Sequence, residues 1–98
     1  MVDWFVYMLE CNDKTLYTGI SPNPLNRFKM HQMGKGAKYT RGRGPFTLRY
    51  LKRTASKGEA LSVECYIKQL SRSKKLHLIK ESHRQTSTIQ KELMQEEA

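Results

Sequence analysis

The start of the chain reads as a β-hairpin, and this pairing constrains the fold more than any other feature. Residues 4–9 form a continuous apolar and aromatic run, which is typical of a buried strand. Residues 12–14 (Asn-Asp-Lys) predict a turn, because Asn and Asp tolerate left-handed backbone conformations. Residues 15–20 are rich in β-branched and aromatic side chains and predict a second strand. The short gap between these segments indicates that they pair as a hairpin.

A helix and a basic loop are expected after the hairpin. Ser-Pro-Asn-Pro at 21–24 ends the second strand, with Asn23 as the expected N-cap and Pro24 at the first helical position. The helix should reach about residue 33. A glycine-rich loop with four lysines and arginines then covers residues 34–45.

One further strand and two helical stretches complete the pattern. Residues 46–51 alternate loosely and predict a third strand. Ser56 and Glu59 have the spacing of a capping box, which predicts the start of an amphipathic helix. The apolar residues of that helix recur at steps of three and four: Ala60, Val63, Ile67 and Leu70. A second helical stretch should end near Glu81.

The order of the expected elements is β-β-α-β-α-α, which predicts an α+β domain over residues 3–82. Its sheet would be small, three-stranded and mainly antiparallel, with helices flanking it. Residues 83–98 are a polar C-terminal tail, either helical or disordered. A chain of 98 residues can bury one modest core, so we expect one domain.

Composition favours a cytoplasmic protein. Apolar residues make up 38% of the chain, and no run approaches the roughly 18 apolar residues of a membrane span. The N-terminus lacks the pattern of a signal peptide. Cys11 and Cys65 lie outside any metal-ligand spacing and are expected to be reduced thiols.

Positive charge is concentrated in the middle of the chain, and it favours a nucleic acid partner. The net charge is +9, and in residues 35–80 thirteen lysines and arginines face two glutamates. A field of this sign attracts a polyanion, chiefly through phosphate contacts. Lysine-driven solubility and an anionic membrane surface are the alternatives, but arginines that alternate with glycine and tyrosine do not form an amphipathic membrane-binding helix.

Two pairs of side chains are suited to phosphate chemistry. Tyr7 and Tyr17 come from opposite arms of the hairpin, and whether they share a face depends on register. Two tyrosines in a hairpin are, taken alone, more often packing residues. Arg27 and His31 stand one turn apart on one helical face. Arginine can bind a phosphate through two hydrogen bonds, and histidine exchanges protons near neutral pH. The alternative is that both residues lie on an ordinary solvent-exposed helix face.

A carboxylate and the basic loop add metal-binding and nucleic-acid-binding candidates. Glu64 flanks the apolar stripe of its helix, where it could hold Mg²⁺ together with water, or pair with Lys68 one turn on. The loop offers cations and an aromatic ring for phosphate contact and base stacking, unless it is merely a flexible, solvated loop. The nucleic-acid-binding candidates are Lys35, Lys38, Tyr39, Arg41 and Arg43.

Taken together, these segments resemble the GIY-YIG nuclease superfamily, and more narrowly its compact, stand-alone bacterial single-domain branch. The matching positions follow the family's order: Phe5-Val6-Tyr7, Tyr17-Thr18-Gly19, Arg27, His31, the segment 36–41 and Glu64. Phe5 stands in place of the first glycine of the family motif, and Thr18 in place of the second isoleucine.

The resemblance implies hydrolysis of DNA phosphodiester bonds with one Mg²⁺ or Mn²⁺ ion held by Glu64. Tyr17 would activate the attacking water, directly or with His31. Tyr7 would orient the nucleophile, and Arg27 would neutralise the charge of the transition state. DNA repair, or the processing of damaged or branched DNA, is the expected setting.

Two other functions remain open at this point. The chain could be a nucleic-acid-binding module that has the nuclease fold but little or no cleavage activity. It could also use its basic surface to meet an acidic protein partner. In the nuclease hypothesis, a protein partner could supply target specificity.

Overall fold

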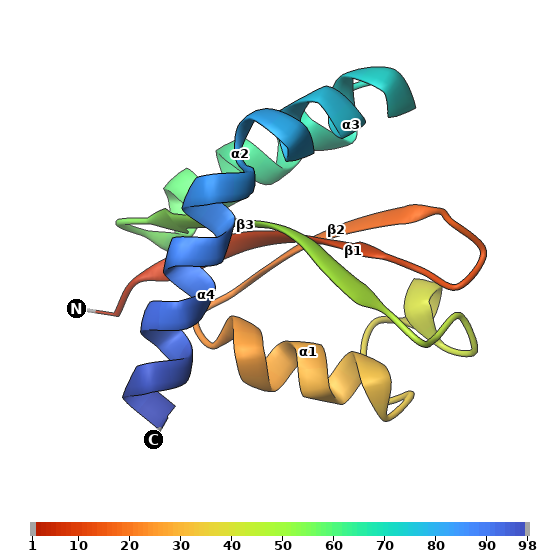
Figure 1. Cartoon of the computed structure of the whole chain (residues 1–98), viewed down its shortest axis with the longest axis horizontal. Helices are drawn as coiled ribbons and strands as arrows, with labels where there is room; N and C mark the ends of the chain where they lie inside the picture. Colours follow the sequence, from red (N-terminus) through yellow and green to blue (C-terminus); the bar gives the residue numbers. More distant parts are fainter. Residues whose placement is uncertain (1, 98) are drawn as a thin grey trace.

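The computed structural model describes residues 2–97, and three antiparallel strands form its sheet in the order β2-β1-β3 (Figure 1). The strands are β1 (Trp4–Glu10), β2 (Leu16–Ser21) and β3 (Thr47–Thr54). The helices are α1 (Pro24–Gln32), α2 (Lys57–Lys68), α3 (Arg72–Glu81) and α4 (His83–Glu97), and a 3-10 turn, η1, covers Lys38–Thr40. The predicted α+β class and the hairpin are confirmed. Of the helices in residues 2–97, none is long and apolar enough to cross a membrane.

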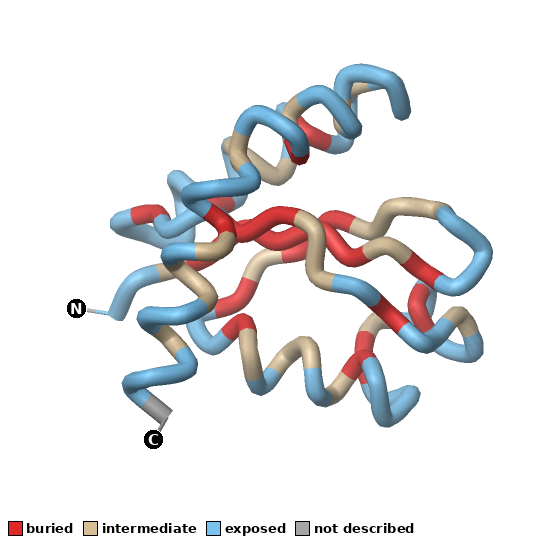
Figure 2. The backbone as a smooth tube through the Cα atoms, in the orientation of Figure 1, coloured by how far each residue is buried: buried red, intermediate tan, exposed pale blue. Residues whose placement is uncertain are grey.

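Alternate side chains of the central strand β1 divide the core into two clusters. Phe5, Tyr7 and Leu9 face α1 and α4, whereas Val6 and Met8 face α2 and α3. In Figure 1, α2 and α3 lie on one side of the sheet and α1 on the other. Burial is concentrated in the strands, and the helices turn broad exposed faces outward (Figure 2). The sheet is therefore covered on both faces, and residues of β1 reach opposite sides of the molecule.

Local sequence signals fix where the elements begin and turn. Lys14 has a φ of 71° in the hairpin turn, the left-handed conformation that short turns require. Three helices begin at polar N-caps whose side chains accept a hydrogen bond from the amide three residues ahead: Asn23, Ser56 and Ser71. The third strand extends beyond the predicted residues 46–51, to Thr54, because Thr54 pairs with Trp4 at the start of β1.

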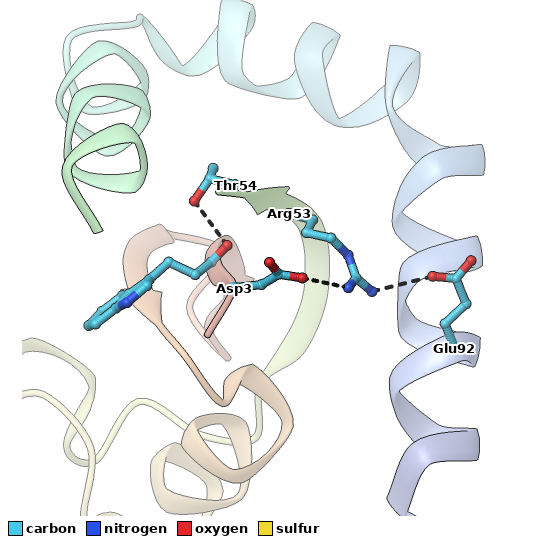
Figure 3. Close-up of polar contacts among 5 residues, drawn as sticks. Asp3, Arg53, Thr54 and Glu92 are labelled. Carbon is cyan, nitrogen blue, oxygen red and sulfur yellow. Dashed lines mark hydrogen bonds and ion pairs between the residues drawn. The ribbon is translucent and has the colours of Figure 1, made fainter. Parts of the chain in front are cut away.

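The polar C-terminal tail forms α4, which packs along β3. Ile89 and Leu93 pack against the cluster on the Tyr7 side of the sheet. Arg53 of β3 pairs with Glu92 of α4 at 3.3 Å and with Asp3 at 2.9 Å, so one guanidinium joins α4 to the N-terminal segment (Figure 3). These contacts make α4 a cover for the edge strand of the sheet.

The hydroxyl of Thr86 in α4 accepts a hydrogen bond from the backbone amide of Leu51 at 3.1 Å, and both residues are buried. Replacing Thr86 with valine keeps its shape but leaves that amide without a partner. We expect Thr86→Val to lower the free energy of unfolding by about 1–3 kcal/mol, measured by urea denaturation. Thr86→Ser should retain most of the stability, and Thr88→Val, at an exposed position of α4, should change little. Equal stability of both valine variants would contradict this role of Thr86.

Candidate active site

The two tyrosines share one face of the hairpin. The register pairs Tyr7 with Gly19 and Leu9 with Tyr17, which places all four residues on the side of the sheet that faces α1. The tyrosine rings lie 6.4 Å apart between centroids. A Cβ atom at Gly19 would lie 2.6 Å from the Tyr7 hydroxyl oxygen, which is too close for any side chain. The Tyr7 phenol therefore lies across β2 over the bare backbone of Gly19.

Helix α1 places His31 directly against this phenol. The Tyr7 hydroxyl and Nε2 of His31 lie 2.9 Å apart, and His31 is only 1% exposed. The ring centroid of Tyr17 lies 5.4 Å from that of His31. On another side, Gly36 packs so closely on the imidazole that a side chain there would overlap it. His31 is thus enclosed by both tyrosines and by the loop that follows α1.

Burial and nearby charges keep this inner pair neutral. The pKa of Tyr7 is raised to about 12, chiefly by burial and then by the charge of Tyr17, with a smaller contribution from Glu64. A hydrogen bond and the charge of Arg27 oppose this rise. Burial, with the charge of Arg27, lowers the pKa of His31 to about 4. We expected His31 to exchange protons near neutral pH because of its residue type. Its burial shifts this exchange to a lower pH. At neutral pH the site holds an uncharged phenol and an uncharged imidazole.

Arg27 and Glu64 supply the charges around this pair. Arg27 is half-buried one turn before His31 on α1. Glu64 lies on α2, with 18% of its side chain exposed, and its carboxylate is 3.4 Å from Lys68, so the ion pair that was the alternative for Glu64 is present. The charge of Glu64 nevertheless acts on Tyr7 as well.

Glu64 is the carboxylate of this site that could bind a metal ion. Within residues 2–97 no group of three or more His, Cys, Asp or Glu side chains is arranged to hold a metal ion. A single hard oxygen ligand fits Mg²⁺, which usually keeps several waters and binds through one or two carboxylates. Glu64 fits such a role, and its partner Lys68 would have to release it.

The basic loop reaches the site through an aromatic stack. Tyr39 of η1 stacks on Tyr17 with centroids 5.8 Å apart and an interplanar angle of 22°. The guanidinium of Arg43 lies 4.5 Å from the Tyr39 centroid and also pairs with Asp13. The other three cations predicted to bind nucleic acid are exposed: Lys35, Lys38 and Arg41. Arg43 is thus engaged within the protein, whereas the other three cations of the loop face solvent.

Two residues that sequence reasoning missed hold this loop in place. The side-chain amide of Gln32 donates to the carbonyl of Phe46 at 3.1 Å and accepts from its amide at 3.0 Å. Thr40 is 1% exposed, and its hydroxyl lies 2.8 Å from Nδ1 of His31. No periodicity or charge pattern marks either residue. The only sequence signal was the place of Thr40 within the segment 36–41 that resembles the small-branch signature.

A comparison with known protein families identifies the domain. A family model described as the GIY-YIG catalytic domain matches residues 3–77. The chain belongs to the GIY-YIG family. GIY-YIG membership places it in a nuclease superfamily whose enzymes generally use a divalent metal and act on DNA. Thr18, which stands where the motif has isoleucine, is buried, and its hydroxyl has no hydrogen-bond partner among the described residues.

Its relatives include small proteins of similar length. A UPF0213 protein of Oceanobacillus iheyensis is 55% identical over 76% of this chain and 87% of that protein. One from Clostridium perfringens is 47% identical over 91% of this chain and 96% of that protein. The solution NMR structure of a UPF0213 protein from Bacillus halodurans, 49% identical, matches with a TM-score of 0.53 over 80% of this chain and 83% of that one. A structure from E. faecalis, 30% identical, matches with a TM-score of 0.54 over 78% and 82%.

The buried neutral His31 makes the stability of the fold depend on pH. Its charged neighbours are Arg27 on its own helix and, when ionised, Tyr7 and Tyr17 on the strands. The unfolded chain protonates this histidine below about pH 6.5, whereas the folded chain does so only near pH 4. Between these values the unfolded state binds more protons, so the free energy of unfolding should fall as pH drops from about 6.5 to about 4. The expected loss is at most about 3 kcal/mol.

Urea denaturation at pH 7 and pH 4.5 measures this loss. His31→Gln should reduce the difference between the two pH values, whereas His77→Gln, at an exposed position, should leave it as in the wild type. The same pH difference in wild type and His31→Gln would rule out the assigned contribution of His31.

Proposed function

We propose that this GIY-YIG protein is a metal-dependent DNA endonuclease that hydrolyses phosphodiester bonds. The supporting observation is that four of the five predicted catalytic side chains each act on the hydroxyl of the fifth, Tyr7, by a hydrogen bond or by their charge. The five are Tyr7, Tyr17, Arg27, His31 and Glu64. Structural packing alone does not explain why a histidine, a guanidinium and a carboxylate all act on one buried phenol.

The environment of each phenol divides their roles. Tyr7 has a pKa of about 12 and a hydrogen bond to His31, so it stays protonated and is suited to orient the nucleophile. Tyr17 is half-buried beside it and takes the role of activating the attacking water, directly or with His31. Arg27 would stabilise the charge that builds on the phosphate in the transition state.

Glu64 would hold the divalent ion, Mg²⁺ or Mn²⁺. When bound, such an ion stabilises negative charge on phosphate oxygens. Lys68, now 3.4 Å from the Glu64 carboxylate, is half exposed and can turn to solvent when the ion binds. DNA itself would lie along the exposed cations of the loop, next to the stacked rings of Tyr17 and Tyr39. Processing of damaged or branched DNA remains part of the proposal.

Nicking of supercoiled plasmid and cleavage of a branched oligonucleotide, each with Mg²⁺ or Mn²⁺, test the proposal. We expect Glu64→Gln and Arg27→Ala each to lower the cleavage rate by roughly 10²-fold or more, while DNA binding stays within severalfold. Glu81→Gln and Arg84→Ala, at exposed positions, are the matched controls and should cleave as the wild type does. DNA binding without cleavage of either substrate in either metal would instead favour the alternative, a binding module with the nuclease fold.

The exposed loop cations should control affinity. Each phosphate contact that is lost reduces the salt slope of binding by about 1. We therefore expect Lys38→Ala and Arg41→Ala each to weaken DNA binding and flatten its salt dependence by that amount, measured by fluorescence anisotropy. Lys91→Ala, in the acidic segment of α4, is the control and should leave the slope unchanged. Unchanged slopes in both loop variants would place the DNA elsewhere on the protein.

A further inference from the structure

The hydroxyl proton of Thr40 can be donated to only one neighbour, the carbonyl oxygen of Ala37. The Thr40 hydroxyl lies 2.8 Å from the carbonyl oxygen of Ala37 and 2.8 Å from Nδ1 of His31. A carbonyl oxygen can only accept a hydrogen bond, and a threonine hydroxyl carries a single proton. Two oxygens at this distance need that proton between them, so Thr40 donates to Ala37.

The directions of both hydrogen bonds made by His31 follow from this one. Because its proton is committed, Thr40 can only accept from Nδ1 of His31, and Nδ1 must therefore carry a hydrogen. The pKa of His31 lies at about 4, so the ring is neutral at pH 7 and carries only that one N–H. Nε2 is then the bare acceptor, and the Tyr7 hydroxyl, 2.9 Å away, must donate to it.

We propose that Thr40 is a positioning residue that selects the Nδ1–H tautomer of His31 and thereby directs the Tyr7 hydroxyl proton toward His31. With its proton held there, the phenolic oxygen of Tyr7 presents only lone pairs to its remaining neighbours. It can accept a hydrogen bond from Arg27 and another from an attacking water. Tyr7 is thereby committed to orienting the nucleophile as an acceptor, a consequence that rests on the proposed function.

The surroundings of Thr40 hold it in this position. Its backbone amide donates to Ala37 at 3.0 Å, and its carbonyl accepts from Arg43 at 3.1 Å. The bare backbone of Gly36 lets this part of the loop lie against the imidazole. The opposite tautomer would point the lone pair of Nδ1 at the lone pairs of the Thr40 oxygen, in a site closed to water. The structure of the loop therefore favours the Nδ1–H tautomer of His31.

Nitrogen NMR of the ¹⁵N-histidine-labelled 98-residue protein at pH 7 tests the tautomer directly. In the wild type we expect His31 to show a protonated Nδ1 and a non-protonated Nε2. Thr40→Val keeps the shape of the side chain but removes the acceptor, so it should shift His31 toward the Nε2–H form or a mixture, and Thr40→Ser should restore the wild-type pattern. A wild-type His31 in the Nε2–H form would overturn the proposal, even if Thr40→Val fails to fold. So would an unchanged His31 spectrum in a folded Thr40→Val variant.

Cleavage assays then test the consequence for catalysis. We expect Thr40→Val to lower kcat for plasmid nicking by roughly tenfold or more, with KM for DNA nearly unchanged and activity recovered in Thr40→Ser. Thr47→Val, at an exposed position, is the matched control. Full activity in a Thr40→Val variant that has lost the tautomer would overturn the role of Thr40 in catalysis. A wild type that does not cleave would contradict the proposed function instead, and the NMR result would still decide the tautomer.

Discussion

The buried hydrogen bond between Tyr7 and His31 is the interaction on which the candidate site depends. It joins the central strand to α1 across 24 residues of sequence, at 2.9 Å and away from solvent. Two glycines make it possible, because Gly19 leaves room for the phenol over β2 and Gly36 leaves room for the imidazole under the loop. A side chain at either position would force the two rings apart. The glycine of the Tyr17-Thr18-Gly19 motif is therefore required by packing against Tyr7, in addition to any role in the strand.

This bond also separates the site into a neutral interior and a charged rim. Burial pushes the pKa of Tyr7 upward and that of His31 downward, so both groups avoid charge in the low-dielectric interior. Arg27 and Glu64 stay closer to solvent, where a phosphate or a hydrated ion can reach them. The opposing effects of their charges on Tyr7 mean that binding of either kind of ligand would change the acidity of that phenol. Ligand charge and proton affinity are thus coupled at one atom.

Much of the fold was predictable from the sequence because its signals are local. The hairpin, the N-caps at Asn23 and Ser56 and the apolar stripe of α2 depend on neighbours within a few residues. The register that brings Tyr7 and Tyr17 to one face, and the burial of His31, depend on contacts between distant segments, so the residue pattern left them open. The tail was ambiguous because α4 has few apolar residues; it docks through Ile89 and Leu93 and through the hydroxyl of Thr86. Apart from its place in the segment 36–41, Thr40 carries no local signal, because its hydroxyl acts on the ring of His31, which lies on another element.

The placement of Thr40 links DNA binding to chemistry through a single loop. Its sequence neighbours are Tyr39, which stacks on Tyr17, and Arg41, which is exposed beside it. A strand of DNA that contacts Arg41 and Tyr39 would bind the same short turn that holds Thr40 against His31. Gln32 of α1 also makes two hydrogen bonds to the backbone of Phe46, at the far end of the loop. A displacement of the loop would therefore also move α1, which carries both Arg27 and His31. DNA binding by the loop and the orientation of the Tyr7 hydroxyl are therefore structurally coupled.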